Sequence, residues 1–402
     1  MRFSLLAEVL DYRRMWSGTV NHMVMALEAD GHEVDSIDIP ALSTLASITQ
    51  AMSKAQRRGL DRDIALDRTA ILARIKARLI RQHLCDRDGS DALLVPVGST
   101  LLPFLKVDLP VVYVSDATLP LITDYYNRYA HFSPKTRRRA VALERAALKA
   151  VDLGVFPTWW AAASARDDLG LPEERILVAP FGPNISDPPA RADVFGPRRP
   201  GPTRLLFCAV EWERKGGPVV LNMMERLRNA GRDVELTIVG VAPPGDGVSA
   251  GVTVVPYLDK RDPDEARRFR EIFAQADLFV MPTQAECFGM VFCEAAAYAT
   301  PSLATRTGGV PEVVRDGETG ILLPPGADGA AYAAEVAALI DDSDRLQRLR
   351  RAVRKDYDDR LNWAAWARDV VARTTPLVEA RRARTVPDTL SISSARSIEL
   401  PS

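Results

Sequence analysis

The chain has 402 residues, of which 47% are apolar, and this is enough for two or three domains that each bury a core. Its 52 basic and 53 acidic residues leave a formal net charge of -1. This balance argues against a nucleic-acid-binding protein, which would carry a broad cationic field. No apolar run reaches the roughly 18 residues that a membrane-spanning helix needs.

The cysteines and the amino terminus predict the compartment. The cysteines stand at positions 85, 208, 287 and 293, a spacing that matches no metal-binding pattern, so we expect free thiols in a reducing cytoplasm. The acid at Glu8 comes too early for the apolar core of a signal peptide. We therefore predict a cytoplasmic protein whose first residues form a strand.

The first predicted unit is a strand over residues 2–8, a turn at Ser17-Gly18-Thr19 and a helix over 19–29. Val20 and Val24 keep helical spacing, and Gly31 ends the helix. A helix amino terminus after a strand and a glycine turn can accept phosphate. No Gly-x-Gly-x-x-Gly motif is present, which argues against a nicotinamide-dependent dehydrogenase.

A second predicted strand spans 33–39, and residues 42–84 read as largely helical. Within them, residues 71–81 form an amphipathic segment with a basic face. This face is either a solvated helix surface or a peripheral contact with an anionic membrane.

Two further strands, over 91–97 and 109–115, have near-continuous aliphatic residues, as expected for a parallel sheet covered on both faces. Asp116 directly follows the second of them. This carboxylate is either a turn residue or a group that hydrogen-bonds a ligand or takes up a proton.

A linker separates two predicted domains. Residues 186–202 are too rich in proline and glycine to form core structure. We place a first domain at 1–187, the linker at 188–202 and a second domain at 203–359. A terminal helix over 360–380 completes the first domain, and we expect a disordered tail over 382–402.

The second domain opens with a predicted strand over 204–210 and a cationic glycine loop that contains Arg214 and Lys215. Later, the apolar run 276–282 predicts a central strand, followed by Glu286 and a helix that carries Glu294. Because ligands bind beyond the carboxyl ends of parallel strands, both glutamates are expected to face one crevice.

Four motifs follow one another after this strand. They are Glu-Cys-Phe-Gly at 286–289, Glu-Ala-Ala-Ala-Tyr-Ala-Thr-Pro at 294–301, Thr-Gly-Gly-Val-Pro-Glu-Val-Val at 307–314 and Asp-Gly-Glu-Thr-Gly-Ile-Leu-Leu at 316–323. The series resembles the donor-binding half of the retaining family 4 glycosyltransferases (glycosyl transferases group 1). The resemblance is strong over 203–345 and weaker over 1–185. It implies an α/β protein of the GT-B fold, with two Rossmann-like domains across a cleft and a terminal helix that crosses back to the first.

The resemblance also implies roles for particular residues. Lys215 would bind the donor diphosphate, Glu286 the donor sugar near the reacting carbon, and Glu294 the ribose hydroxyls. With Asp116, Lys215 and Glu286 form the candidate catalytic set. The remaining candidate donor-binding residues are Gly18, Thr19, Arg214, Tyr257, Phe288, Gly289, Met290 and Val291.

Two departures from the family pattern stand out. Ser115-Asp116 occupies the place where many members carry a histidine, and Val210 occupies that of an arginine, for which Arg214 is a candidate replacement. The resemblance implies a metal-independent enzyme with no cofactor. The pairs Asp61/Asp63 and Asp86/Asp88 imitate the Asp-x-Asp sites of the other glycosyltransferase fold, but neither follows a convincing strand.

The predicted function is transfer of a sugar, with retention, from a UDP- or GDP-sugar to a glycan, lipid-linked or small-molecule acceptor. Main-chain recognition of the nucleobase near Tyr257 leaves the nucleotide open. Three alternatives remain: a glycosidase, a nucleotide-sugar 2-epimerase, and a non-catalytic relative that binds a glycan or a partner protein. The sequence indicates no oligomeric state.

Overall fold

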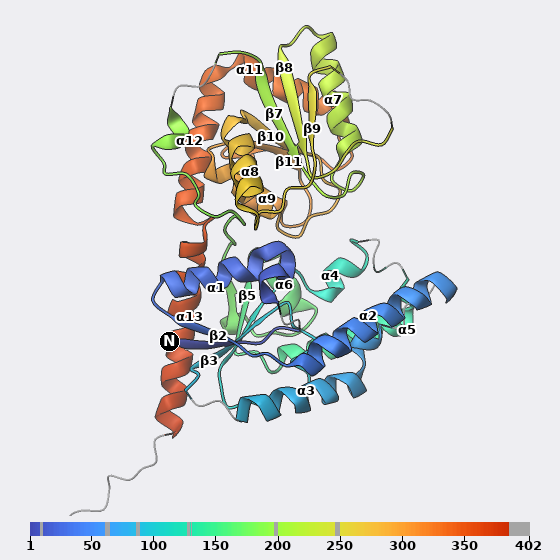
Figure 1. Cartoon of the computed structure of the whole chain (residues 1–402), viewed down its shortest axis with the longest axis vertical. Coiled ribbons are helices and arrows are strands. Elements are labelled where there is room, and N and C mark those ends of the chain that lie inside the picture. Colours follow the sequence, from blue (N-terminus) through green and yellow to red (C-terminus); the bar gives the residue numbers. More distant parts are fainter. Residues whose placement is uncertain are drawn as a thin grey trace, which may run out of the picture.

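The computed structural model describes residues 1–8, 11–60, 65–85, 89–126, 129, 131–196, 200–245 and 250–385. The chain forms two α/β domains, stacked along the long axis of the molecule in Figure 1. Each domain is built on a six-stranded parallel sheet. The predicted GT-B architecture is confirmed.

The first sheet has the order β2-β1-β3-β4-β5-β6. Its strands are β1 (Arg2–Leu5), β2 (Glu33–Ser36), β3 (Ala92–Pro96), β4 (Val111–Val114), β5 (Leu153–Phe156) and β6 (Ile176–Val178). Every residue of β3, β4 and β5 is buried, because helices cover both faces of the sheet. The chain reverses its direction of travel across the sheet between β1 and β3.

The second sheet has the order β12-β11-β10-β7-β8-β9. Its strands are β7 (Thr203–Cys208), β8 (Val234–Val239), β9 (Val252–Val255), β10 (Leu278–Met281), β11 (Ser302–Thr305) and β12 (Gly320–Leu323). Read from β9, this is the doubly wound Rossmann order 3-2-1-4-5-6, whose switch point lies between β7 and β10. Ligands bind at this point in such sheets, and it carries the two loops that the sequence analysis singled out.

The helices of the first domain are α1 (Thr19–Ala29), α2 (Pro40–Leu60), α3 (Ala70–Cys85), α4 (Leu119–Thr123), α5 (Pro134–Leu148) and α6 (Trp159–Asp167), with 3-10 turns η1 (Tyr12–Gly18), η2 (Leu66–Arg68) and η4 (Glu173–Arg175). Helix α1 buries Val20, Met23, Val24 and Leu27, as its helical spacing predicts. In Figure 1 it lies on the side of the first domain that faces the second.

One prediction for α3 was incomplete. Lys76 does not belong to its exposed basic face: the side chain is fully buried, forms an ion pair with Glu8 and donates a hydrogen bond to Thr100 Oγ1 over 3.1 Å. Arg74 and Arg78 remain exposed. The reason is geometric, since Lys76 lies two positions from each of these arginines and so points to the opposite side of the helix.

The second domain contains α7 (Gly217–Asn229), α8 (Pro263–Gln275), α9 (Met290–Ala297), α10 (Val310–Val313), α11 (Gly329–Asp341) and α12 (Ser343–Asp359), and the 3-10 turn η5 (Asp193–Phe195) lies in the linker. None of the helices within the described residues is long and apolar enough to cross a membrane. The Asp61/Asp63 and Asp86/Asp88 pairs lie outside the described residues.

The terminal helix α13 (Trp363–Thr385) returns to the first domain, as predicted, and runs along its side in Figure 1. The indole Nε1 of Trp363 donates to the carbonyl of Pro183 over 2.8 Å, and Arg382 pairs with Asp91. The predicted bounds of 360–380 were too short, because the helix continues to Thr385. Residues 382–385, assigned to the tail, are therefore helical, and the tail from 386 lies outside the described residues.

Candidate active site

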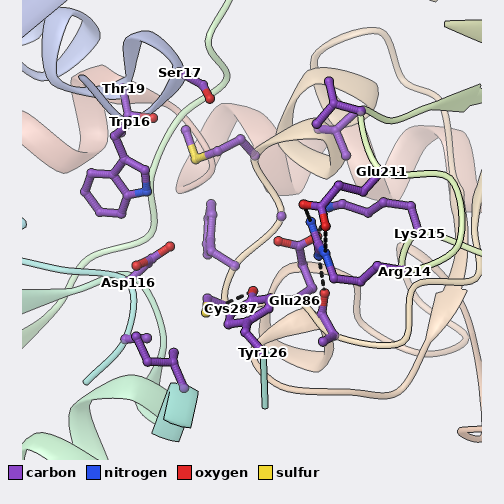
Figure 2. Close-up of a pocket in the computed structure, with 18 of the residues that line it drawn as sticks. Trp16, Ser17, Thr19, Asp116, Tyr126, Glu211, Arg214, Lys215, Glu286 and Cys287 are labelled. Atoms are coloured by element: carbon purple, nitrogen blue, oxygen red, sulfur yellow. Dashed lines mark hydrogen bonds and ion pairs between the residues drawn. The ribbon is translucent and has the colours of Figure 1, made fainter. Parts of the chain in front are cut away.

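A cleft of about 1270 Å³ lies between the two domains. Its second-domain wall comes from the loops after β7, β8, β9 and β10, and its first-domain wall from the loops after β1, β3, β4 and β6. Figure 2 shows the two walls: Trp16 and Asp116 stand on one side, and the ion pairs of Arg214 and Lys215 stand on the other. The cleft therefore lies where both sheets end their parallel strands.

Lys215 and Glu286 meet on the second-domain wall. The loop after β7 carries the lysine, the loop after β10 carries the glutamate, and the ammonium binds Glu286 Oε2. Gly216 makes this approach possible, because it has φ +84° and a Cβ there would overlap the carbonyl of Pro282. The ammonium has three donors and, among the described residues, uses one of them for Glu286, which leaves two for a ligand.

Arg214 is fixed from three directions. Its Nε and NH2 donate to the carboxylate of Glu211 over 3.0 and 2.6 Å, and NH1 donates to the carbonyl of Ala285 over 2.7 Å. The guanidinium also lies 5.4 Å from the ring centre of Tyr126. This leaves two of its five N–H donors for an anion in the cleft.

Lys260 is a cleft residue that the sequence analysis missed. Its Nζ lies 2.6 Å from Oε1 of Glu294, whose side chain is 4% exposed within helix α9. The two residues are 34 positions apart, and the only sequence signal was a cation three positions after Tyr257, near which the nucleobase was expected. Lys260 and Lys215 therefore each hold one of the two predicted glutamates.

The amino terminus of α9 closes this wall. Gly289 has φ +87° and precedes the helix, and a Cβ there would clash with the ring of Phe292. Phe288 is buried, and its ring packs edge-on against Phe181 of the first domain with centroids 5.3 Å apart. Glycine at 289 thus sets the approach of the helix, whose first N–H groups are suited to an anion.

The first-domain wall begins with a strained turn. Trp16 and Ser17 have φ of 53° and 56°, and Gly18 follows with φ of 89°. For residues other than glycine this conformation costs roughly 1 to 2 kcal/mol each. Asn184 stabilises the turn, because its Nδ2 donates to Ser17 O over 3.2 Å and to Thr19 Oγ1 over 2.9 Å.

Asn184 also offers an unused acceptor. Its side chain is 3% exposed and lines the cleft, and within the described part of the chain its Oδ1 has no hydrogen-bond partner. A buried polar atom without a partner is unfavourable unless water or a ligand satisfies it. This atom therefore favours a cleft that holds a polar ligand.

Asp116 faces the cleft beside Trp16 (Figure 2). Burial raises the pKa of its carboxyl to about 7, the charge of Glu286 adds to the rise, and a hydrogen bond with the Trp16 side chain opposes it. A carboxyl in this range can release or take up a proton near neutral pH. Of the two sequence-based interpretations, its placement in the cleft supports a functional group.

Tyr125 and Tyr126 connect the two walls, and the sequence analysis did not single them out as site residues. The hydroxyl of Tyr125 accepts a hydrogen bond from Glu286 N over 2.8 Å, and that of Tyr126 lies 3.3 Å from Cys287 Sγ. These contacts join residues 161 positions apart. Sequence showed only an aromatic cluster, which gave no indication of its partners.

The structure brings nearly all predicted site residues to this one cleft. Glu286, Asp116, Lys215 and Arg214 line it, as do the residues predicted to bind the donor, Thr19, Tyr257, Phe288, Gly289, Met290, Val291 and Glu294. Gly18 does not line the cleft itself, because its backbone turns between Ser17 and Thr19, which do. Among the described residues, no cluster of three or more His, Cys, Asp or Glu side chains could hold a metal ion.

Comparison with protein families places the second domain. Residues 202–342 match the model of glycosyl transferases group 1. The second domain belongs to this family. Among curated relatives of the group 1 domain are a D-inositol 3-phosphate glycosyltransferase of Nocardia farcinica, 32% identical over 45% of this chain, and a glycogen synthase of Mycobacterium tuberculosis, 33% identical over 42%. The matched regions span 43% and 42% of those relatives, less than half of their length.

Solved structures share the fold of nearly the whole chain. A glycosyltransferase from Rickettsia africae superposes with a TM-score of 0.63 at 13% identity, covering 94% of this chain and 98% of that one. The Anabaena protein HepE, in complex with UDP and glucose, superposes with a TM-score of 0.58 at 17% identity, covering 95% of this chain and 100% of that one. At such identities the likeness shows the GT-B fold alone.

Proposed function

We propose that the chain is a retaining glycosyltransferase that moves a sugar from a nucleotide-diphosphate sugar to an acceptor. The observation that carries the proposal is the pair of lysine–glutamate contacts at the Rossmann switch point, Lys215 with Glu286 and Lys260 with Glu294. Cations there suit a diphosphate, and carboxylates suit the hydroxyls of a sugar and a ribose. The group 1 assignment of residues 202–342 supports this chemistry.

The donor would enter with its diphosphate toward the free donors of Lys215 and Arg214 and the first N–H groups of α9. These groups stabilise the negative charge that develops on the leaving diphosphate, and each contributes on the order of 3 kcal/mol to the transition state. Glu286 already holds Lys215, and Glu211 and the carbonyl of Ala285 already hold Arg214. Little reorganisation is therefore needed when the donor binds.

The carboxylates would bind the two sugars of the donor. Glu286 lies in the loop after β10 and would accept hydrogen bonds from the transferred sugar near its reacting carbon. Glu294, one turn into α9, would accept them from the ribose. Tyr257, which is 63% exposed at the rim of the cleft, would cover the nucleobase. HepE was crystallised with UDP-glucose, which favours UDP-sugars as the first donors to test.

Asp116 faces this donor site from the first domain, where the acceptor would bind. As a carboxylate it would orient an acceptor hydroxyl and stabilise the positive charge that develops on the sugar ring. In the family that this chain resembles, a donor phosphate oxygen takes the acceptor proton. Asp116 then replaces the usual histidine as the group that positions the acceptor hydroxyl and stabilises the charge on the sugar ring.

An exposed surface of the first domain favours a lipid-linked acceptor over a free glycan or a small molecule. Helices α2 and α3 contain no acidic residue. On α3, Ile71 and Ile75 are exposed next to Arg74, whose guanidinium lies 4.6 Å from the ring centre of the exposed Phe104. Apolar and cationic side chains on one face suit an anionic bilayer.

Vesicle sedimentation tests this contact. The full chain should bind phosphatidylglycerol vesicles more strongly than phosphatidylcholine vesicles, and Arg74→Glu should abolish the difference. Arg268→Glu, at an exposed position on α8 of the second domain, is the matched control. Equal binding of wild type and Arg74→Glu to the anionic vesicles would refute the membrane contact.

Calorimetry tests the donor site itself. UDP-, GDP- and ADP-glucose are titrated into the wild type and into Lys215→Ala, Lys260→Ala and Glu294→Ala. Loss of one charge-assisted hydrogen bond of about 2 kcal/mol weakens binding roughly thirtyfold. Lys355→Ala, at a 68% exposed lysine on α12, is the control and should bind as the wild type does.

The same experiment separates the alternatives. If none of the three donors binds to the folded wild-type chain, the transferase proposal fails and a non-catalytic GT-B relative is favoured. If a donor binds and is converted without acceptor into its 2-epimer, which NMR detects, the chain is an epimerase. Saturable binding of one donor that the three cleft variants weaken supports the transferase.

A further inference from the structure

Segment 307–312, Thr-Gly-Gly-Val-Pro-Glu, is a prominent motif that donor binding does not explain. All six residues are described, and none of them lines the cleft. The segment follows β11 and continues into α10. Its contacts are with the Glu286 loop on one side and with the first domain on the other.

The two glycines press the segment against the Glu286 loop. A Cβ on Gly308 would overlap the carbonyl oxygen of Glu286, and one on Gly309 would overlap that of Cys287. The N–H of Gly309 donates to the carbonyl of Glu286 over 3.3 Å. Glycine at both positions therefore lets the segment support the main chain of Glu286 directly.

Tyr125 joins the same place from the first domain. Its hydroxyl accepts from the N–H of Glu286 and lies 2.8 Å from Thr307 Oγ1 and 3.3 Å from the carbonyl of Glu286. One phenol thus binds both peptide groups of Glu286 and the first residue of the segment. Burial raises the pKa of this phenol, so the hydroxyl stays protonated and keeps its donor.

Glu312 makes a second contact with the first domain. Its two carboxylate oxygens accept from the main-chain N–H groups of Trp159 and Trp160 over 2.6 and 2.8 Å. These are the first residues of α6, and Thr158 Oγ1 accepts the third N–H, that of Ala161. A carboxylate of the second domain thereby completes the amino terminus of a helix in the first.

Glu312 is itself anchored at the return crossing of the chain. Its carbonyl accepts from Arg360 NH2 over 2.8 Å, and Arg360 pairs with the buried Asp356 of α12 over 2.8 Å. Arg360 lies between α12 and α13. A change in the angle between the domains would therefore act on the segment at Glu312.

We propose that segment 307–312 is a two-point latch that couples closure of the cleft to the placement of Glu286, with Tyr125 as the positioning residue. In the closed arrangement Tyr125 and Glu312 hold the segment against the first domain, and the glycines transmit this position to Glu286. When the domains separate, Glu286 loses the hydrogen bond to its N–H. This inference rests on the proposed function only where it assigns Glu286 to the donor sugar.

Hydrogen exchange measured by mass spectrometry tests the coupling on the full chain without any ligand. Glu312→Gln should speed exchange at 159–160, which it contacts, and also at 284–288, where its side chain makes no contact. Tyr125→Phe keeps the ring, which packs with its centroid 5.5 Å from that of Trp160. The variant should speed exchange at 284–288, where the hydroxyl binds, and also at 159–160, where the hydroxyl makes no contact. Loss of one hydrogen bond corresponds to roughly fivefold faster exchange. Glu318→Gln, at a 69% exposed carboxylate in the loop after α10, is the matched control.

A kinetic measurement then separates positioning from mere stability. With the donor identified by calorimetry, Tyr125→Phe should lower kcat roughly tenfold while the dissociation constant of the donor stays within about twofold, because geometry at the reacting carbon is lost and not donor contacts. Thr307→Val, which keeps the side-chain shape and removes the hydroxyl, is a second variant should Tyr125→Phe fold poorly.

Independent responses would overturn the latch. If Glu312→Gln changes exchange only at 159–160 and Tyr125→Phe only at 284–288, the two contacts are not coupled. Failure of every donor to bind would instead refute the transferase proposal and leave the exchange result unaffected. The two failures are therefore distinguishable.

Discussion

Replacing Asp116 with asparagine should raise the free energy of unfolding of the first domain. The increase over the wild type should be larger at pH 8 than at pH 5. The cause is the cost of an ionised carboxyl in the cleft. Burial and the neighbouring charge of Glu286 raise the pKa of Asp116 from 3.8 to about 7. Asparagine has nearly the same shape and no charge to desolvate.

The sign follows from proton binding. Between pH 3.8 and pH 7 the folded chain holds a proton on Asp116 that the unfolded chain has released. The wild type therefore loses stability as the pH rises through this window, and the loss is complete above pH 7. A gap of about three pH units corresponds to about 4 kcal/mol, and because water reaches this wall of the cleft we expect about 2 kcal/mol.

The assay is urea unfolding at pH 5, 6, 7 and 8, followed by tryptophan fluorescence because Trp16 lies beside Asp116. The free-energy difference between Asp116→Asn and the wild type should grow between pH 5 and 7 and then level off. Glu174→Gln, at an exposed carboxylate of the first domain, should show no such trend.

Two outcomes would refute this reasoning. Parallel stability curves for the wild type and Asp116→Asn from pH 5 to 8 would mean that Asp116 ionises as it does in the unfolded chain. An unchanged trend in the Glu286→Gln background would mean that the charge of Glu286 does not contribute.

Two further substitutions test the packing around the cleft. Gly309→Ala should lower the free energy of unfolding by about 2 kcal/mol and reduce transfer activity, because its Cβ would overlap Cys287 O. Gly196→Ala places its Cβ in open space and should change neither quantity. Thermal melting and initial rates measure the two effects. Lys76→Met should lower the free energy of unfolding, measured in urea, by about 3 kcal/mol, because it leaves Glu8 without its ammonium partner. Adding Glu8→Gln should recover part of this stability. An equal loss in the double variant would contradict the ion-pair argument.

The sequence was informative where function depends on local pattern. The strand at Leu278–Met281 was predictable because a parallel sheet covered on both faces needs a continuous apolar run. Lys215 and Glu286 were predictable because each lies in the loop that follows such a strand. The expectation that the two residues share a crevice needed only the rule that parallel strands end at one edge.

The rest of the site depends on contacts that a single sequence does not encode locally. Lys260 was missed because its role comes from Glu294, and Tyr125 because its partner Glu286 lies 161 positions away in the other domain. Trp16 was missed because a left-handed backbone at a tryptophan contradicts its own preference and exists only through tertiary contacts. The burial of Lys76, in contrast, was predictable from the sequence, because its offset of two positions from Arg74 and Arg78 places it on the opposite side of the helix.

The return of α13 means that the chain passes between the domains twice, first through the linker at 188–202 and again at 360–362. Two covalent connections leave fewer relative motions than one. Rotation about the line that joins the two crossings changes the length of neither, so we expect this rotation to be the main motion. The opening of the cleft is therefore more restricted than in a chain that crosses once, and a distance between labels on the two domains would follow it.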